Sequence, residues 1–347
     1  MKTIFDSTKL HNLALKNRVF RSATWMAMAD YNGYVTDKIV RLYKAYAEGG
    51  IGAIITGITS VVPVDMALDG IMLFSDDSYI EGHRRVTDAV HQAGSKIFLQ
   101  TAMVASCKAD GNGNLREMPI DQWTKDEIRE IVGYFGDSAL RAKQAGYDGV
   151  QIHAAHFFFL SRFISPLLNH RRDKYGGSSE NRARILVEVL EDMRGKAGKD
   201  FCVIAKINAS DEAAGGVSTE DFLTACAMLA DAGIDAIEVS ANQTSRPLIK
   251  PGVNEAYFKD YALRLKERCD VPVILVGGHR SIEGMNQVLN ETGIEYLSMS
   301  RPFVREPALL NRWKSGDTRP SACVSCNSCY GTPDHQCIFN LKRGLTL

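Results

Sequence analysis

The sequence lacks an excess of either charge, because 41 acidic residues balance 41 basic ones. A balanced chain has no electrostatic reason to bind nucleic acid or an anionic membrane as its main partner. It also lacks any uninterrupted apolar run near the roughly 20 residues that cross a bilayer. The amino-terminal MKTIFDSTKL has no apolar signal core, so a cytoplasmic protein is expected. A small-molecule partner is therefore expected, and a homo-oligomer is compatible with these features.

Two further absences concern the fold. No Gly-x-Gly-x-x-Gly follows the first expected strand, which disfavours a doubly wound open sheet, the second architecture considered. The chain has no low-complexity segment and no linker before about residue 315, which favours a single domain. A length of 347 residues with 45% hydrophobic residues suits one large barrel.

Short apolar runs alternate with longer amphipathic stretches along the chain. Eight runs are predicted as strands: 19–23, 53–56, 96–100, 149–153, 202–207, 236–240, 273–276 and 296–300. Helix-like segments between them include 38–49, 79–93, 125–145, 179–196, 219–232 and 254–268. Eight units in strict alternation predict parallel strands and an α/β fold, the TIM (β/α)8 barrel. We assign 1–316 to this barrel, with 1–16 as a hairpin plug, and 317–347 to a cysteine-containing tail packed on it.

The run Val150-Gln-Ile-His-Ala-Ala-His156 places two histidines where a buried strand is expected to end. The carboxyl ends of barrel strands form the active-site face. Residues three apart in a straight strand point to opposite sides, but a turn at Ala154-Ala155 would let His153 and His156 serve one site. There each imidazole could donate a hydrogen bond to an oxyanion. The pattern alone is also compatible with a metal pair or with two unrelated polar residues.

A phosphate site is predicted at the ends of the seventh and eighth strands, because the loops that follow them commonly hold phosphate in this fold. The residues concerned are Gly277, Gly278, Ser300 and Arg301. Glycines let backbone N–H groups approach an anion, and a guanidinium can hold it with two hydrogen bonds. The alternative is a pair of tight turns with a surface arginine.

Residues 160–182, LSRFISPLLNHRRDKYGGSSENR, follow the histidine pair. Together with His153 and His156 they closely resemble the Old Yellow Enzyme family of FMN-dependent ene-reductases, and the resemblance extends from Asn17 to Pro302. It implies FMN as the cofactor, NAD(P)H as the reductant, and reduction of the activated C=C bond of α,β-unsaturated carbonyl compounds. His153 and His156 would hold the carbonyl oxygen while the flavin delivers hydride.

The resemblance also implies flavin contacts, position by position. Lys206 falls where the family places a cation, more often arginine, beside the N1–C2=O edge, where positive charge stabilises the reduced flavin. Gln100 matches the glutamine that binds the pyrimidine edge of the ring. Trp25 lies where relatives carry a residue that tunes the flavin potential, and we expect it to shape the substrate face. The backbone contacts to the ring fall at Ala23, Thr24 and Gly57.

The chain departs from the family at Phe158, where relatives carry the tyrosine that protonates the substrate. Phenylalanine has no transferable proton, so water or another side chain must supply it, unless the substrate needs no such step. Phe158 is therefore assigned to the substrate site. One alternative is oxidative demethylation of a small methylated amine, although that branch has a tyrosine where this chain has His153. Another is a flavin-binding protein with little ene-reductase activity.

Four cysteines cluster near the end of the chain as Cys323-x2-Cys326-x2-Cys329-x7-Cys337. Four thiolates so close in sequence could ligate zinc or an iron–sulfur cluster, with His335 as a candidate replacement ligand. The arrangement resembles the cluster segment of larger relatives, 2,4-dienoyl-CoA reductase and trimethylamine dehydrogenase, although the spacing is tighter here. The alternative is vestigial thiols packed against the barrel.

Overall fold

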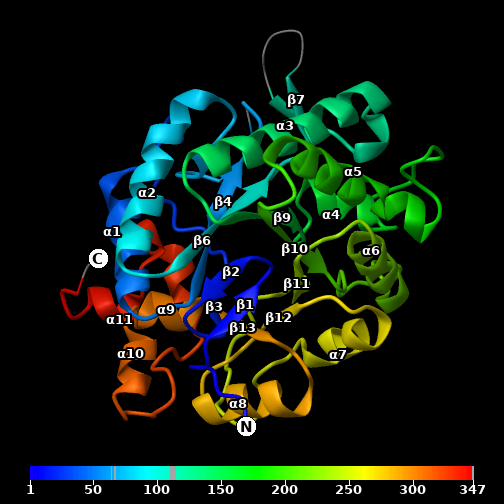
Figure 1. The fold of residues 1–347 in the computed structure, drawn as a ribbon. Helices are drawn as coiled ribbons and strands as arrows, with labels where there is room; N and C mark the ends of the chain where they lie inside the picture. The colour runs from blue at the N-terminus through cyan, green and yellow to red at the C-terminus, as the bar shows by residue number, and fades with distance from the viewer. Residues whose placement is uncertain (64, 66–67, 110–114, 346–347) are drawn as a thin grey trace.

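The computed structural model describes residues 1–63, 65, 68–109 and 115–345. Eight parallel strands form its centre: β3 (Val19–Arg21), β4 (Ala53–Ser60), β6 (Lys96–Ala102), β9 (Gly149–Ala154), β10 (Cys202–Asn208), β11 (Ala236–Ser240), β12 (Val273–Val276) and β13 (Tyr296–Met299). Each strand pairs with its neighbours, and β3 pairs with both β13 and β4, so the sheet closes on itself (Figure 1). The predicted TIM barrel is confirmed.

The longer helices surround this barrel (Figure 1). They are α1 (Asp37–Glu48), α2 (Ile80–Gln92), α3 (Lys125–Gln144), α5 (Ser179–Ala197), α6 (Thr219–Asp231), α7 (Lys259–Arg268) and α8 (Ile282–Glu291). Capping boxes begin two of them, with Thr124 and Glu127 starting α3 and Ser218 and Asp221 starting α6. These reciprocal bonds satisfy backbone N–H groups that have no partner inside the helix.

The predicted helix 254–268 is wrong over its first five residues, because α7 begins only at Lys259. The N–H of Tyr257 donates instead to the carbonyl oxygen of Gly277, 3.1 Å away. This bond draws the segment before α7 onto the glycine turn that follows β12. A tertiary contact therefore overrides the local helical pattern and brings an aromatic ring to the active-site end.

The first residues form an antiparallel hairpin of β1 (Thr8–Leu10) and β2 (Leu13–Leu15). Its Leu10 and Leu15 are buried and belong to one apolar cluster with Phe20 and Phe98, which lie on barrel strands. The hairpin thus covers apolar side chains near the amino-terminal ends of the strands. The carboxyl ends are left to form the site.

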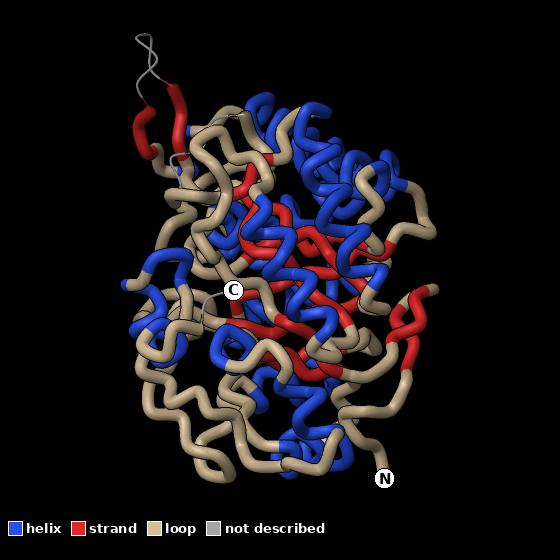
Figure 2. Tube along the Cα trace, turned by 90° about the vertical axis from the view of Figure 1, so that its left-hand side faces the viewer, coloured by secondary structure: helices blue, strands red, loops and turns tan. Residues whose placement is uncertain are grey.

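The segment 103–122 contains a second antiparallel hairpin, β7 (Cys107–Ala109) with β8 (Leu115–Glu117), which projects from the barrel (Figures 1 and 2). The sequence of this segment predicts a long irregular loop that acts as a lid or substrate wall, with a surface insertion as the alternative. Its Asp110-Gly-Asn-Gly113 tip lies outside the described residues. The part that is described does not line the main cavity.

The remaining elements are short. They comprise β5 (Met72–Leu73), η1 (Asp77–Tyr79), η2 (Ile120–Gln122), α4 (Phe159–Ile164), α9 (Arg301–Arg305), α10 (Leu309–Lys314), η3 (Ser328–Gly331), η4 (Pro333–His335) and α11 (Ile338–Leu341). The last three belong to the tail, which an ion pair of 2.8 Å between Asp334 and Lys38 ties to α1. Among the described residues, the structure contains no helix with the length and apolar character needed to cross a membrane.

Candidate active site

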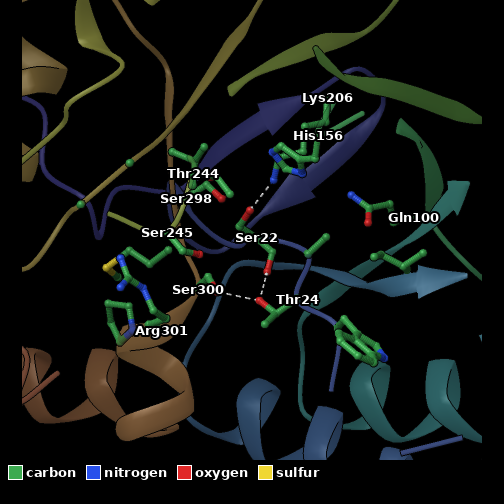
Figure 3. A pocket seen from close by; sticks show the side chains of 18 of the residues that line it. Ser22, Thr24, Gln100, His156, Lys206, Thr244, Ser245, Ser298, Ser300 and Arg301 are labelled. Atoms are coloured by element: carbon green, nitrogen blue, oxygen red, sulfur yellow. Dashed lines mark hydrogen bonds between the residues drawn. The ribbon is translucent and has the colours of Figure 1, made fainter. Parts of the chain in front are cut away.

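A cavity lies at the carboxyl ends of the barrel strands (Figure 3). Twelve residues singled out from the sequence line it: Ala23, Thr24, Trp25, Gln100, His153, His156, Phe158, Lys206, Gly277, Gly278, Ser300 and Arg301. Arg301 and Gln100 lie on opposite sides of it in Figure 3. With Ile58 of β4 and Ser245 after β11, which also line it, residues from all eight barrel strands or the loops after them meet in one space.

Gly57 is the exception among the predicted flavin contacts. It lines a smaller neighbouring cavity together with Thr24 and Trp25. Its N–H donates to the hydroxyl of Tyr43 at 2.6 Å. The backbone N–H of Gly57 is therefore already bound to a side chain of α1. Gly57 does not line the main cavity, whereas its neighbour Ile58 does.

A left-handed turn brings the two histidines together. Strand β9 ends at Ala154, and His156 and Phe157 follow with φ of 62° and 60°. Non-glycine residues adopt this conformation at a cost of roughly 1–2 kcal/mol each, and such strain is concentrated at functional sites. The turn falls two residues later than expected, and it leaves the rings of His153 and His156 with centroids 5.1 Å apart at 82°.

Burial keeps both imidazoles neutral. It lowers the pKa of His153 well below 6.5, and the charge of Lys206, with that of His156 when protonated, acts in the same direction. It lowers the pKa of His156 to about 3, again with help from Lys206. His156 Nε2 lies 2.9 Å from the hydroxyl of Ser240. His153 Nδ1 is buried and has no hydrogen-bond partner within the described chain.

The charge of Lys206 is balanced by a carboxylate that the sequence analysis missed. Glu238 is fully buried, and its Oε2 lies 3.3 Å from Lys206 Nζ. It accepts hydrogen bonds from Ser22 (2.7 Å), Ser298 (2.8 Å) and Gln151 (2.8 Å). Burial raises the pKa of Glu238, but Lys206 and these three donors outweigh it, so the net shift is downward and Glu238 is ionised.

Gln100 belongs to the same network. Its Nε2 donates to Gln151 Oε1 at 2.8 Å, and Gln151 in turn donates to Glu238. A series of contacts therefore runs from Gln100 through Gln151 and Glu238 to Lys206. It orients Gln100 and Lys206, which line the cavity, through Gln151 and Glu238, which are buried behind them. The sequence does contain a signal for Gln151 and Glu238, because each is a polar residue inside an apolar run, in Val-Gln-Ile and Ile-Glu-Val. Such residues are buried only when they have hydrogen-bond or charge partners.

The opposite end of the cavity carries positive charge. Gly277 and Gly278 have φ of 124° and 88°, values that favour glycine, and a side chain on Gly278 would collide with the ring of Tyr257. The hydroxyls of Thr24 and Ser300, which line the same cavity, lie 2.7 Å apart (Figure 3). Arg301 is buried, as is Arg280, a second arginine of this end that the sequence analysis missed.

Phe158 and Trp25 contribute apolar walls. The Phe158 ring centroid lies 4.8 Å from that of His153, so no hydroxyl stands next to the pair at this position. Trp25 is half-buried and packs edge-on against His335 at 4.4 Å. His335 Nδ1 also lies 2.9 Å from the carbonyl oxygen of Trp25. His335 therefore supports Trp25, and our suggestion that it replaces a metal ligand is not supported.

The four tail cysteines line one small cavity of their own. The other residues lining it are Arg301, Val304, Arg305, Val324, Ile338 and Phe339. All four thiols are free. In the chain as described, no three His, Cys, Asp or Glu side chains are grouped so that they could hold a metal ion. The shared cavity is compatible with the sequence pattern, but the present arrangement does not fit a zinc or iron–sulfur centre.

The main cavity suits a ligand with a polar ring at one end and a phosphate at the other, since a lysine and a glutamine face an arginine-rich turn across it. A (β/α)8 barrel with such a site belongs to the class of flavin-dependent oxidoreductases. Residues 3–319 match the model of the NADH:flavin oxidoreductase / NADH oxidase family, and the chain belongs to this family. FMN is the cofactor of this class, and NADH or NADPH is its reductant.

Individual relatives agree with this assignment. The chain is 30% identical to a metal reductase of Desulforamulus reducens over 99% of this chain and 52% of that protein. It is 30% identical to an NADPH dehydrogenase of Clostridium acetobutylicum over 88% and 92%. The solved structure of the old yellow enzyme homologue of Zymomonas mobilis has the same fold, with a TM-score of 0.76, 22% identity, and coverage of 93% of this chain and 96% of that one.

The relatives differ in length. The chain spans about half the length of the first curated proteins that it matches, but more than nine-tenths of the NADPH dehydrogenase. Family membership therefore identifies the barrel and its cofactor class. Substrate and overall activity are treated as proposals.

Proposed function

We propose that this protein uses NADH or NADPH to reduce the activated C=C bond of α,β-unsaturated carbonyl compounds. The observation that carries the proposal is the histidine pair, with rings 5.1 Å apart and the buried His153 Nδ1 without a partner in the described chain. A carbonyl oxygen bound against the pair would accept a hydrogen bond from each imidazole. Such donors stabilise the negative charge that grows on that oxygen as the C=C bond is reduced.

The residues of the two cavity ends fit FMN. Bound FMN supplies hydride transfer between the nicotinamide and the substrate. Lys206, fixed by Glu238 and Ser22, offers positive charge to the polar edge of the ring, and Gln100 offers an amide. Gly277 and Arg301 offer backbone N–H groups and a guanidinium to the phosphate. Each of these roles follows from a side chain or a turn that lines the same cavity.

The proton donor in this proposal differs from the tyrosine that the resemblance implies. Phe158 lies against His153 and has no acidic proton, and both imidazoles are poor acids in their neutral form. Water or another side chain therefore supplies the proton in this proposal. The apolar wall that Phe158 makes also favours substrates with an apolar part next to the carbonyl group.

An anaerobic two-step experiment tests the proposal. NADPH or NADH is first added to the purified protein, and bleaching of the visible flavin absorbance is expected. 2-Cyclohexen-1-one is then added, and the absorbance should return as cyclohexanone forms in equal amount. Bleaching without recovery of the absorbance after the enone is added would contradict ene reduction. Bleaching by trimethylamine in place of NADPH or NADH would favour oxidative demethylation. Absence of bleaching would indicate a flavin-binding protein without this activity.

A further inference from the structure

Two buried arginines at the positive end of the cavity are held by the cysteine-containing tail. Arg301 donates to the side-chain oxygen of Asn327 and to the carbonyl oxygen of Arg246, the latter at 2.9 Å. Arg280 is 2% exposed, and its Nη2 donates to the hydroxyl of Ser325 at 2.8 Å. Both arginines line the main cavity, and Arg301 also lines the four-cysteine cavity.

Arg280 has unused hydrogen-bonding capacity. Its Nη1 donates to the carbonyl oxygen of His279 at 2.6 Å, but its buried Nε has no partner in the described chain. Burial lowers the pKa of Arg280, and the nearby charge of Arg301 acts in the same direction. A buried guanidinium with a free N–H beside a second cation is costly unless an anion binds there. The geometry therefore indicates an anion that both arginines share.

The tail is shaped to make these contacts. Ser325 and Asn327 both adopt left-handed conformations, with φ of 58° and 60°, on either side of Cys326. Asn327 Nδ2 also donates to the carbonyl oxygen of Ser245 at 2.8 Å, and Tyr330 Oη lies 2.6 Å from Ser245 Oγ. Tyr330 and Ser245 both line the main cavity. The tail loop is thus part of the wall at the end where the phosphate is expected.

We propose that Arg280 is a second ligand of the flavin phosphate and that the tail residues Ser325 and Asn327 position Arg280 and Arg301 for it. The inference rests on the proposed FMN site and goes beyond it. The tail then contributes to the affinity for the flavin, and this role does not depend on its four cysteines. Ser325 and Asn327 act as positioning residues, because they bind the arginines and are not among the residues that line the main cavity.

The test compares FMN with riboflavin, which lacks only the phosphate. Ser325→Gly and Asn327→Gly remove the side chains at positions where glycine adopts the left-handed conformation without strain. Each should weaken FMN binding to the full-length apoprotein roughly tenfold, because an arginine that loses its hydrogen bond to the tail is no longer held in place for the phosphate. Riboflavin binding should change less than about twofold. Asp334→Gly is the matched control, since Asp334 is a left-handed tail residue (φ 55°) that contacts Lys38.

Arg280→Lys and Arg301→Lys test the arginines as phosphate ligands separately from the positioning role of the tail. If both reduce the preference for FMN over riboflavin but the two glycine variants do not, the tail has no positioning role and the inference is overturned. Equal weakening of both flavins in the glycine variants would also overturn it, because that pattern reports general loosening. If neither arginine variant changes the preference, the phosphate site of the proposed function fails as well.

Discussion

At the residue scale, the histidine pair depends on burial for its role. An imidazole in water is about half protonated near pH 6.5. Here burial holds the pKa of His156 at about 3 and that of His153 well below its usual value, so each ring carries one N–H and no charge. A neutral donor binds a carbonyl oxygen without attracting competing anions. The same environment makes either ring a poor proton donor.

The first prediction is that His153→Ala and His156→Ala each slow enone reduction. Loss of one oxyanion donor typically costs about 2.7–4 kcal/mol, or roughly a hundred- to a thousandfold in rate. Phenol, whose phenolate mimics the charge on the substrate oxygen, should also bind more weakly and give less long-wavelength absorbance. Turnover and phenol affinity equal to wild type in both variants would show that the pair is structural.

The second prediction concerns Phe158→Tyr. If protonation limits turnover because no acid stands beside the pair, a hydroxyl at this position should raise the rate with simple cyclic enones. General acid catalysis contributes typically ~10²–10⁴-fold where the acid is well placed, and a grafted hydroxyl should recover only part of that. The measurement is kcat with its solvent isotope effect. An unchanged isotope effect with equal or lower kcat would mean that water supplies the proton and that Phe158 selects the substrate.

About half of the residues that line the cavity could be predicted from the sequence, because they fall at strand ends or in long motifs. Glu238, Gln151 and Arg280 could not. Glu238 and Gln151 each interrupt an apolar run, which indicates a buried polar residue, but their partners lie 32 to 216 positions away along the chain, so the sequence does not show what they bind. Arg280 follows the predicted glycine turn directly, but its role depends on a tail that returns to the same place.

At the scale of elements, strand register creates the charged pair. Lys206 on β10 stands opposite Glu238 on β11 and opposite His153 on β9. Parallel strands of a closed barrel point corresponding residues inward, so the three polar groups share one layer of the interior. Lys206 and Glu238 would each be costly alone in this setting, and they stabilise each other by opposite charge, while His153 stays neutral beside them.

The third prediction separates the structural and cofactor roles of Lys206. Lys206→Met leaves the Glu238 carboxylate buried without its cation, which should lower the free energy of unfolding by about 3–5 kcal/mol. The double variant Lys206→Met/Glu238→Gln removes both charges and should recover much of this loss. Both variants should lower the flavin reduction potential, because the positive charge near the ring is gone. A potential unchanged in the double variant would mean that Lys206 only balances Glu238.

Elements were predicted well where apolar periodicity dominates and poorly where distant contacts decide. The eight strands are found within a few residues of their predicted bounds, since buried parallel strands read as continuous apolar runs. The start of α7 was misplaced because Tyr257 binds the turn after β12. The β7–β8 hairpin was not predicted, because its strands have three residues each and β8 exposes Arg116 and Glu117, so no apolar run marks it.

At the scale of the whole molecule, buried histidines make stability depend on pH. His83 is fully buried with its Nδ1 2.8 Å from the hydroxyl of Tyr147, and burial lowers its pKa to about 4. His279 has a pKa of about 4 for the same reason. In the unfolded chain each histidine takes up a proton below pH 6.5, whereas the folded chain does not until about pH 4. Stability is therefore present above pH 6.5 and is lost as the pH falls toward 4.

The fourth prediction follows from this linkage. Between pH 7 and pH 5, each histidine whose pKa falls from 6.5 to about 4 on folding should cost about 2 kcal/mol of unfolding free energy. His83→Asn keeps an acceptor for the hydroxyl of Tyr147 but has no group that titrates in this range. It should lower stability at both pH values by a similar amount, because the packing of the imidazole against Phe74 is lost. Urea unfolding of both proteins at the two pH values gives the comparison. The pH-dependent loss should be smaller in the variant by about 2 kcal/mol, and an equal loss in both proteins would mean that His83 is already protonated, or already accessible to water, in the folded state.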